Sequence, residues 1–162
     1  MADPKDPLIF DQSSDDARQM QRLLAIMACL RDPVRGCPWD IEQDFDSFAP
    51  YTIEEAYEVA DAIQQGDRRA LREELGDLLL QVIYFTQMGS EAGHFDFDSV
   101  AHGIAEKMIR RHPHVFGGED VADAAAQTRN WEAQKAEERA RKAAEAGKRP
   151  GVLDGISAAF PA

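Results

Sequence analysis

The sequence predicts an all-α protein, a helical bundle of about five helices. Apolar residues recur with the 3.6-residue period of a helix up to Leu30, and again from Leu71 to Val82. Helix-capping Ser and Asp residues precede these segments, and Gly or Pro follows them. The periodicity and the caps together divide most of the chain into segments of helical length.

The first predicted helix begins at the caps near residue 14 and ends at Leu30, before Arg31-Asp32-Pro33. Its predicted core residues are Met20, Leu23, Leu24, Met27 and Leu30. A loop with Gly and Pro follows, and it contains Trp39. That side chain is either a hydrophobic plug that closes the bundle or an aromatic wall beside a ligand, and we favour the plug.

The second predicted helix begins between residues 47 and 51 and ends at Gln64, and the third covers residues 68–91. Gly66 is the expected C-cap and Asp67 the next N-cap. An apolar stripe on the third helix predicts that it is buried and that its acidic side chains face other protein. A glycine within a helix is less favourable than an alanine, so Gly76 indicates that another backbone or a ligand approaches the helix closely there. The stripe consists of Leu71, Leu75, Leu78, Leu79 and Val82.

Five acidic residues are placed to meet across this helical hairpin. Glu54, Glu55 and Glu58 belong to the second predicted helix, whereas Glu74 and Asp77 belong to the third. Residues three or four apart share one face of a helix, so each helix presents a carboxylate pair. Clustered, partly buried carboxylates need cations, and a hard divalent ion is the natural partner. The alternative is a solvated acidic face.

The fourth predicted helix begins at Asp96 or Asp98 and stops at Pro113, with Val100, Ile104 and Met108 expected to face inward. Lys107 and Arg111 lie four residues apart near its end. They either complement the helix dipole or clamp a phosphate. The last predicted helix covers residues 122–146.

Composition limits the classes of partner. The chain has 162 residues and a net charge of −12, which argues against nucleic acid and against anionic membranes. No apolar run approaches the roughly 20 residues that a transmembrane helix needs. Without a signal-peptide pattern, Cys29 and Cys37 are expected to be reduced thiols in a cytoplasmic protein.

Three segments are expected along the chain. Residues 1–13 are predicted to be a flexible lead-in and residues 14–146 a helical domain. Residues 147–162 are predicted to be a C-terminal tail, which could link to a second domain. The length fits one domain with a tail.

The five acids in the pattern E-E-x-x-E … E-x-x-D resemble the signature of all-α nucleoside triphosphate pyrophosphohydrolases. Further landmarks in the expected order make the chain similar to the MazG family over roughly residues 19–135. These landmarks are G-C-P-W-D at 36–40, E-L-G-D-L-L at 74–79, R-R-H-P-H-V-F at 110–116 and N-W-E at 130–132.

This resemblance implies Mg²⁺-dependent hydrolysis of a nucleoside triphosphate to the monophosphate and pyrophosphate, with Mn²⁺ a possible substitute. It also implies a homodimer or a higher homo-oligomer that completes the bundle, and a role in nucleotide-pool sanitation or regulation. By analogy, Glu54 would bind the metal through water or assist the attacking water. The implied metal ligands are Glu55, Glu58, Glu74 and Asp77, and the implied substrate-binding residues are Lys107, Arg111, Trp131 and Lys135.

Two other hypotheses compete with the enzyme. A metal- and nucleotide-binding assembly module of the same fold would bind nucleotide with little turnover. A helical dimerisation domain with surface acids would show no metal affinity. The absence of Glu-x-x-His pairs excludes a di-iron carboxylate bundle.

Overall fold

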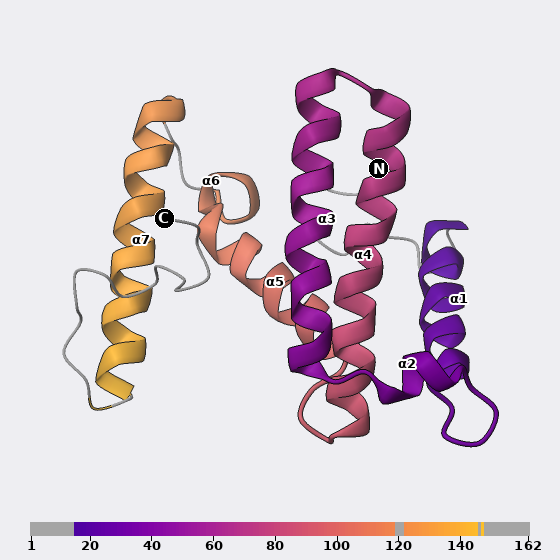
Figure 1. Cartoon of the computed structure of the whole chain (residues 1–162). Helices are drawn as coiled ribbons and strands as arrows, with labels where there is room; N and C mark the ends of the chain where they lie inside the picture. Colours follow the sequence, from indigo (N-terminus) through magenta and orange to yellow (C-terminus); the bar gives the residue numbers. More distant parts are fainter. Residues whose placement is uncertain (1–14, 119–121, 146, 148–162) are drawn as a thin grey trace. The chain divides into compact units, whose positions relative to one another are not determined.

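A computed structural model describes residues 15–118, 122–145 and 147. These residues form seven helices and no strand (Figure 1), which confirms the all-α prediction. The short helix α2 (Pro38–Glu42) replaces part of the predicted loop that contains Trp39, and the short helix α6 (Pro113–Phe116) begins where the fourth predicted helix was expected to stop. The other five are α1 (Asp15–Leu30), α3 (Phe45–Gln65), α4 (Arg68–Glu91), α5 (Phe97–Arg111) and α7 (Ala124–Glu145).

The chain divides into two compact units, one within Leu8–Ala105 and the other within Glu106–Ala162, so the boundary falls inside α5. The predicted lead-in at residues 1–13 lies outside the described residues, and so does the predicted tail apart from Gly147. None of the described helices is long and apolar enough to cross a membrane.

Helices α3 and α4 form an antiparallel hairpin (Figure 1). Helix α3 begins at a capping box, in which the Asp44 carboxylate accepts from the Ser47 backbone N–H and the Ser47 hydroxyl accepts from the Asp44 N–H. Gly66 ends this helix at a φ of 71°, which glycine adopts without strain. The Asp67 side chain then caps α4, which has the bounds that the sequence predicts.

A small core joins α1 to the hairpin. Phe48 of α3 stacks on Tyr84 of α4 with ring centroids 3.8 Å apart. The apolar face of α1 packs against this core, as predicted. The buried members of the core are Met27, Phe48, Ile83, Tyr84 and Met88.

The predicted apolar stripe of α4 is covered only in part. Leu75, Leu79 and Val82 are 49%, 37% and 42% exposed, and the prediction that this face is buried is wrong for the single chain. Among the described residues, α1 packs against Ile83, Tyr84 and Met88 in the C-terminal half of α4, and the other helix that packs closely on α4 is α3. Val100 and Ile104 of α5 were also expected to face inward, but they are 40% and 50% exposed.

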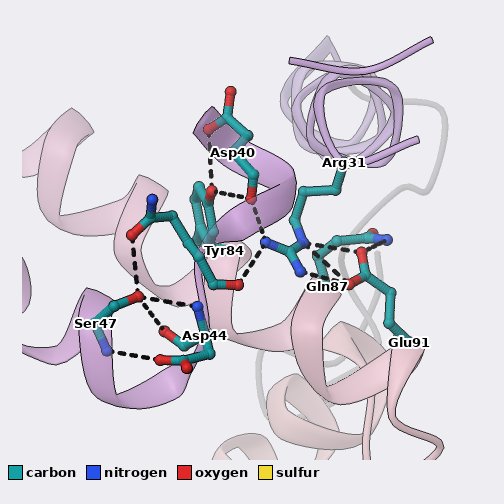
Figure 2. A network of polar contacts seen from close by, with 8 residues as sticks. Arg31, Asp40, Asp44, Ser47, Tyr84, Gln87 and Glu91 are labelled. Carbon is teal, nitrogen blue, oxygen red and sulfur yellow. Dashed lines mark hydrogen bonds and ion pairs between the residues drawn. The ribbon is translucent and has the colours of Figure 1, made fainter. Parts of the chain in front are cut away.

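Polar contacts hold the connection between α1 and α3 in place (Figure 2). The Arg31 guanidinium donates to the backbone carbonyl oxygens of Asp40 and Gln43 and to the Glu91 carboxylate on α4. Trp39 contacts the rings of Phe48 and Tyr51 edge-on, at centroid distances of 6.4 and 6.2 Å, and stays half exposed. It therefore covers an edge of the core without being enclosed.

Candidate metal and nucleotide site

The α3–α4 hairpin brings three of the predicted metal ligands together. Glu55 and Glu58 lie one helical turn apart on α3, and Glu74 lies on α4. Each offers a carboxylate oxygen, and the three oxygens lie within 4.8 Å of one another. That spacing suits a hard divalent cation, which binds through several oxygen ligands.

Burial and mutual repulsion make this cluster costly without a cation. One oxygen of Glu55, Oε2, is buried and has no hydrogen-bond partner. Burial raises the pKa of the Glu55 carboxyl, and the negative charges of Asp77 and Glu58 raise it further. Burial likewise raises the pKa of Glu74, with added repulsion from Glu58 and Asp77.

No ion pair within the described part of the chain joins Lys or Arg to any acid of this cluster. An unpartnered, buried carboxylate oxygen beside two other acids is a site that a divalent cation would satisfy. The residues present therefore fit a Mg²⁺ ion, the metal that the resemblance implies.

The other two acids of the predicted set lie outside the three-oxygen group. Asp77 is exposed, so the expectation that it faces other protein is wrong for the single chain, although its charge still acts on Glu55 and Glu74. Glu54 is exposed on α3. A Cβ added at Gly76 would meet nothing within 4 Å, so within the described residues no other part of the chain approaches that position closely.

The predicted substrate-binding residues belong to the second unit. Arg111 is buried at the end of α5, and Lys107 is half-buried one turn earlier. On α7, the Lys135 ammonium lies 5.2 Å from the centre of the Trp131 ring and 2.8 Å from a Glu132 carboxylate oxygen. Trp131 also contacts His112 edge-on, at a centroid distance of 6.1 Å.

Sequence reasoning missed the partner of Arg111. Glu138 of α7 accepts hydrogen bonds from both Arg110 and Arg111. Glu138 lies 27 residues beyond Arg111 in the chain, and it is one of several acids on a helix rich in charge. No spacing rule could have singled it out.

Part of the chain matches a known protein family. Residues 43–116, which include all five acids and the end of α5, match the family described as the MazG nucleotide pyrophosphohydrolase domain. A crystal structure of a mazG-related protein from Thermotoga maritima is similar over 72% of this chain and 98% of its own. The TM-score is 0.59 and the sequence identity is 26%.

Longer relatives carry names that state an activity. The nucleoside triphosphate pyrophosphohydrolase of Escherichia coli K12 is 49% identical over 89% of this chain and 53% of its own length. A Thermotoga maritima protein named nucleoside triphosphate pyrophosphohydrolase/pyrophosphatase MazG is 43% identical over 75% of this chain and 46% of its own. The chain thus spans about half the length of these relatives. This chain therefore contains, at residues 43–116, a domain of the MazG nucleotide pyrophosphohydrolase family.

Proposed function

We propose that this chain hydrolyses nucleoside triphosphates to the nucleoside monophosphate and pyrophosphate, with Mg²⁺ held by Glu55, Glu58, Glu74 and Asp77. The observation that carries the proposal is the buried, unpartnered Glu55 oxygen within a group of three carboxylates 4.8 Å or less apart. Family membership and the names of the relatives support the same reaction. Sanitation or regulation of the nucleotide pool is the corresponding physiological role.

Mg²⁺ bound at this cluster would neutralise phosphate charge and lower the pKa of a bound water. The four carboxylates would hold the cation, with Glu55 and Glu58 on α3 and Glu74 and Asp77 on α4. Water then attacks directly: its oxygen bonds to phosphorus, the bridging bond between the α and β phosphates breaks, and a proton leaves the water. Glu54, exposed beside the cluster, is the residue proposed to orient that water or accept its proton.

The proposed substrate-binding residues all belong to the second unit. Lys107 and Arg111 are proposed to hold phosphate oxygens, since guanidinium and ammonium groups form short, charge-assisted hydrogen bonds with them. Trp131 and Lys135 already form a stacked cation–aromatic pair on α7, which offers a flat apolar face and a positive charge side by side. These two residues are proposed to contact the nucleoside end of the substrate.

A homodimer, or a higher homo-oligomer, is proposed as the working assembly. Leu75, Leu79 and Val82 recur along one face of α4, and each leaves a third or more of its surface exposed. Such a stripe is typical of a helix–helix interface. Leu79→Glu is expected to shift the sedimenting species toward the monomer, whereas Val34→Glu, at an exposed loop residue, is expected to leave it unchanged. Equal sedimentation of both variants and wild type would contradict this interface.

The reaction is tested by measuring pyrophosphate release from each common NTP and dNTP, with Mg²⁺ and with EDTA. Glu58→Gln and Glu74→Gln are expected to lower the rate roughly 100-fold or more, because each removes a metal ligand. Glu73→Gln is the matched control, since Glu73 is an exposed neighbour of Glu74 that pairs with Arg69.

Release that persists in EDTA, or that survives both substitutions, would contradict the proposed mechanism. Mg²⁺-dependent nucleotide binding without release would instead support the binding-module hypothesis. Absence of metal affinity would support the dimerisation domain.

A further inference from the structure

The second unit contains an ion-pair cluster that spans two helices. One carboxylate oxygen of Glu138 lies 2.9 Å from Arg110 Nη2, and the other lies 2.6 Å from Arg111 Nη2. Glu138 is on α7, and the two arginines are the last residues of α5. The side chains of Arg111 and Glu138 are only 10% and 17% exposed, so water screens the pair weakly. These contacts hold the pKa of Glu138 at about 2.

One donor of this cluster is not saturated, because Arg111 Nε is buried and has no hydrogen-bond partner. Gln134 Oε1 on α7, an acceptor, is also buried without a partner. A cavity of about 490 Å³ adjoins the cluster, a volume within the range of small-molecule sites. Glu138 lines that cavity, but Arg111 does not. A ligand in the cavity would therefore reach Arg111 past the Glu138 carboxylate.

A carboxylate that bridges two guanidinium groups presents two anionic oxygens to two charged donors. Phosphate oxyanions are bound by arginines in the same way, with two oxygens of one group facing the N–H donors. The Glu138 carboxylate thus presents two anionic oxygens to Arg110 and Arg111, as a phosphate group would.

We propose that Arg110 and Arg111 form a binding site for the phosphate groups of the substrate or of its pyrophosphate product, and that Glu138 occupies this site until phosphate displaces it. The inference rests on the proposed function, because it concerns the same substrate. It adds Arg110 to the binding residues and makes Glu138 an internal competitor of the ligand.

A purely structural tie between α5 and α7 is the competing explanation. The Glu132–Lys135 pair is a useful comparison: it lies on one helix, is more exposed than the Glu138–Arg111 pair and leaves no buried donor unpaired. The Glu138 cluster differs in its buried, unpartnered Arg111 Nε and in the cavity beside it. A donor that Glu138 leaves unpaired is one that a phosphate, with more oxygens, can satisfy.

The test is calorimetric titration of the full chain with inorganic pyrophosphate in EDTA, which keeps the carboxylate metal site out of the measurement. Glu138→Gln is expected to tighten binding roughly fivefold or more, because the amide cannot compete for the arginines as an anion. Glu137→Gln is the matched control: it removes the same charge from the same cavity and the same helix, but Glu137 pairs with neither arginine. It is expected to change affinity by less than about twofold.

Two further variants check that any increase in affinity arises from competition at the arginines. Glu138→Asp keeps the charge but is too short to bridge both guanidinium groups, so a smaller gain is expected. In an Arg110→Gln background the gain from Glu138→Gln should shrink, since the competition takes place at the arginines. Unchanged or weaker pyrophosphate binding by Glu138→Gln, or an equal gain in Glu137→Gln, would overturn the proposal.

The two sources of phosphate are separated by repeating the titration with α,β-methylene ATP. If Glu138→Gln tightens the binding of both ligands, the triphosphate binds in this site. If it tightens the binding of pyrophosphate alone, the product binds there. Because no turnover is involved, tighter binding without pyrophosphate release by any variant would uphold this inference and contradict the proposed reaction. Pyrophosphate release by the wild type, together with unchanged pyrophosphate affinity in Glu138→Gln, would uphold the proposed reaction and contradict this inference.

Discussion

The Arg31 guanidinium lies 2.7 Å from the Glu91 carboxylate, a contact that joins the end of α1 to the end of α4 across 60 residues of sequence (Figure 2). The Arg31 side chain is 8% exposed. It also donates to two backbone carbonyls in the connection that carries α2, so a single side chain holds three segments in place.

Loss of this arginine is expected to destabilise the first unit. Arg31→Met removes the charge and leaves Glu91 and the carbonyls of Asp40 and Gln43 without their donor, at a cost of about 2–3 kcal/mol. Thermal unfolding monitored by calorimetry would measure it. Arg35→Met is the control, since Arg35 is 86% exposed and its contact with Asp32 is 3.9 Å long. A loss of stability as small as that of the control would show that the pair is not structural.

Tyr84 makes stability sensitive to alkaline pH. Its hydroxyl lies 2.9 Å from the carbonyl oxygen and 3.0 Å from a carboxylate oxygen of Asp40. Burial first, and then the contact with Asp40, raises the pKa of Tyr84 from 10.0 to about 12, against an opposing effect of Arg31. The unfolded chain therefore loses this proton at lower pH than the folded protein, so stability falls as pH rises from about 10 to about 12.

Tyr84→Phe is expected to cost about 1 kcal/mol at neutral pH, because a hydrogen bond to Asp40 is lost. The same variant should show a weaker fall of Tm between pH 10 and pH 12 than wild type. Parallel Tm curves for the two proteins over that range would contradict the assignment of the alkaline transition to Tyr84.

The acid cluster is expected to bind metal but to lower the stability of the metal-free protein. The raised pKa of Glu55 means that its contribution to stability is present below the unfolded pKa of 4.5 and is lost as pH rises through the folded value. At neutral pH the metal-free protein therefore carries a charge that its fold disfavours. Glu55→Gln should raise Tm in EDTA at pH 7, and it should abolish the rise in Tm that Mg²⁺ produces in wild type.

Asp61→Asn provides the comparison for Glu55→Gln, because Asp61 is an exposed acid on the same helix and outside the three-oxygen group. Its Tm should respond to Mg²⁺ as wild type does. A lower Tm for Glu55→Gln in EDTA would mean that the Glu55 charge is stabilised by contacts other than a metal.

Two glycines of α4 should respond oppositely to alanine. A Cβ at Gly89 would lie 2.5 Å from the Phe95 ring, so Gly89→Ala must displace that ring and is expected to cost about 1 kcal/mol. A Cβ at Gly76 would meet nothing within 4 Å, and Gly76→Ala should stabilise the helix by about 0.5–1 kcal/mol. Urea unfolding of both variants measures the difference, and effects of the same sign would refute it.

Much of the fold follows from local rules. The bounds of α4 were predictable because Asp67 and Gly66 are strong local signals and the apolar period is long. The meeting of Glu55, Glu58 and Glu74 was predictable for the same reason, since a short turn between two helices fixes which faces confront each other. Local spacing did not reveal the buried state of Glu55 Oε2, because burial depends on neighbouring helices.

By itself, then, the sequence determined the helices, the hairpin and the acidic cluster, because periodicity, caps and spacing act within one turn or one hairpin. Only the tertiary structure decided the contacts that join residues distant in the chain. These include the Arg31–Glu91 pair, the bridge from Glu138 to Arg110 and Arg111, and the approach of Phe95 to Gly89 rather than of any group to Gly76. Such contacts depend on how whole helices pack, and no local pattern of residues encodes which side chains then meet.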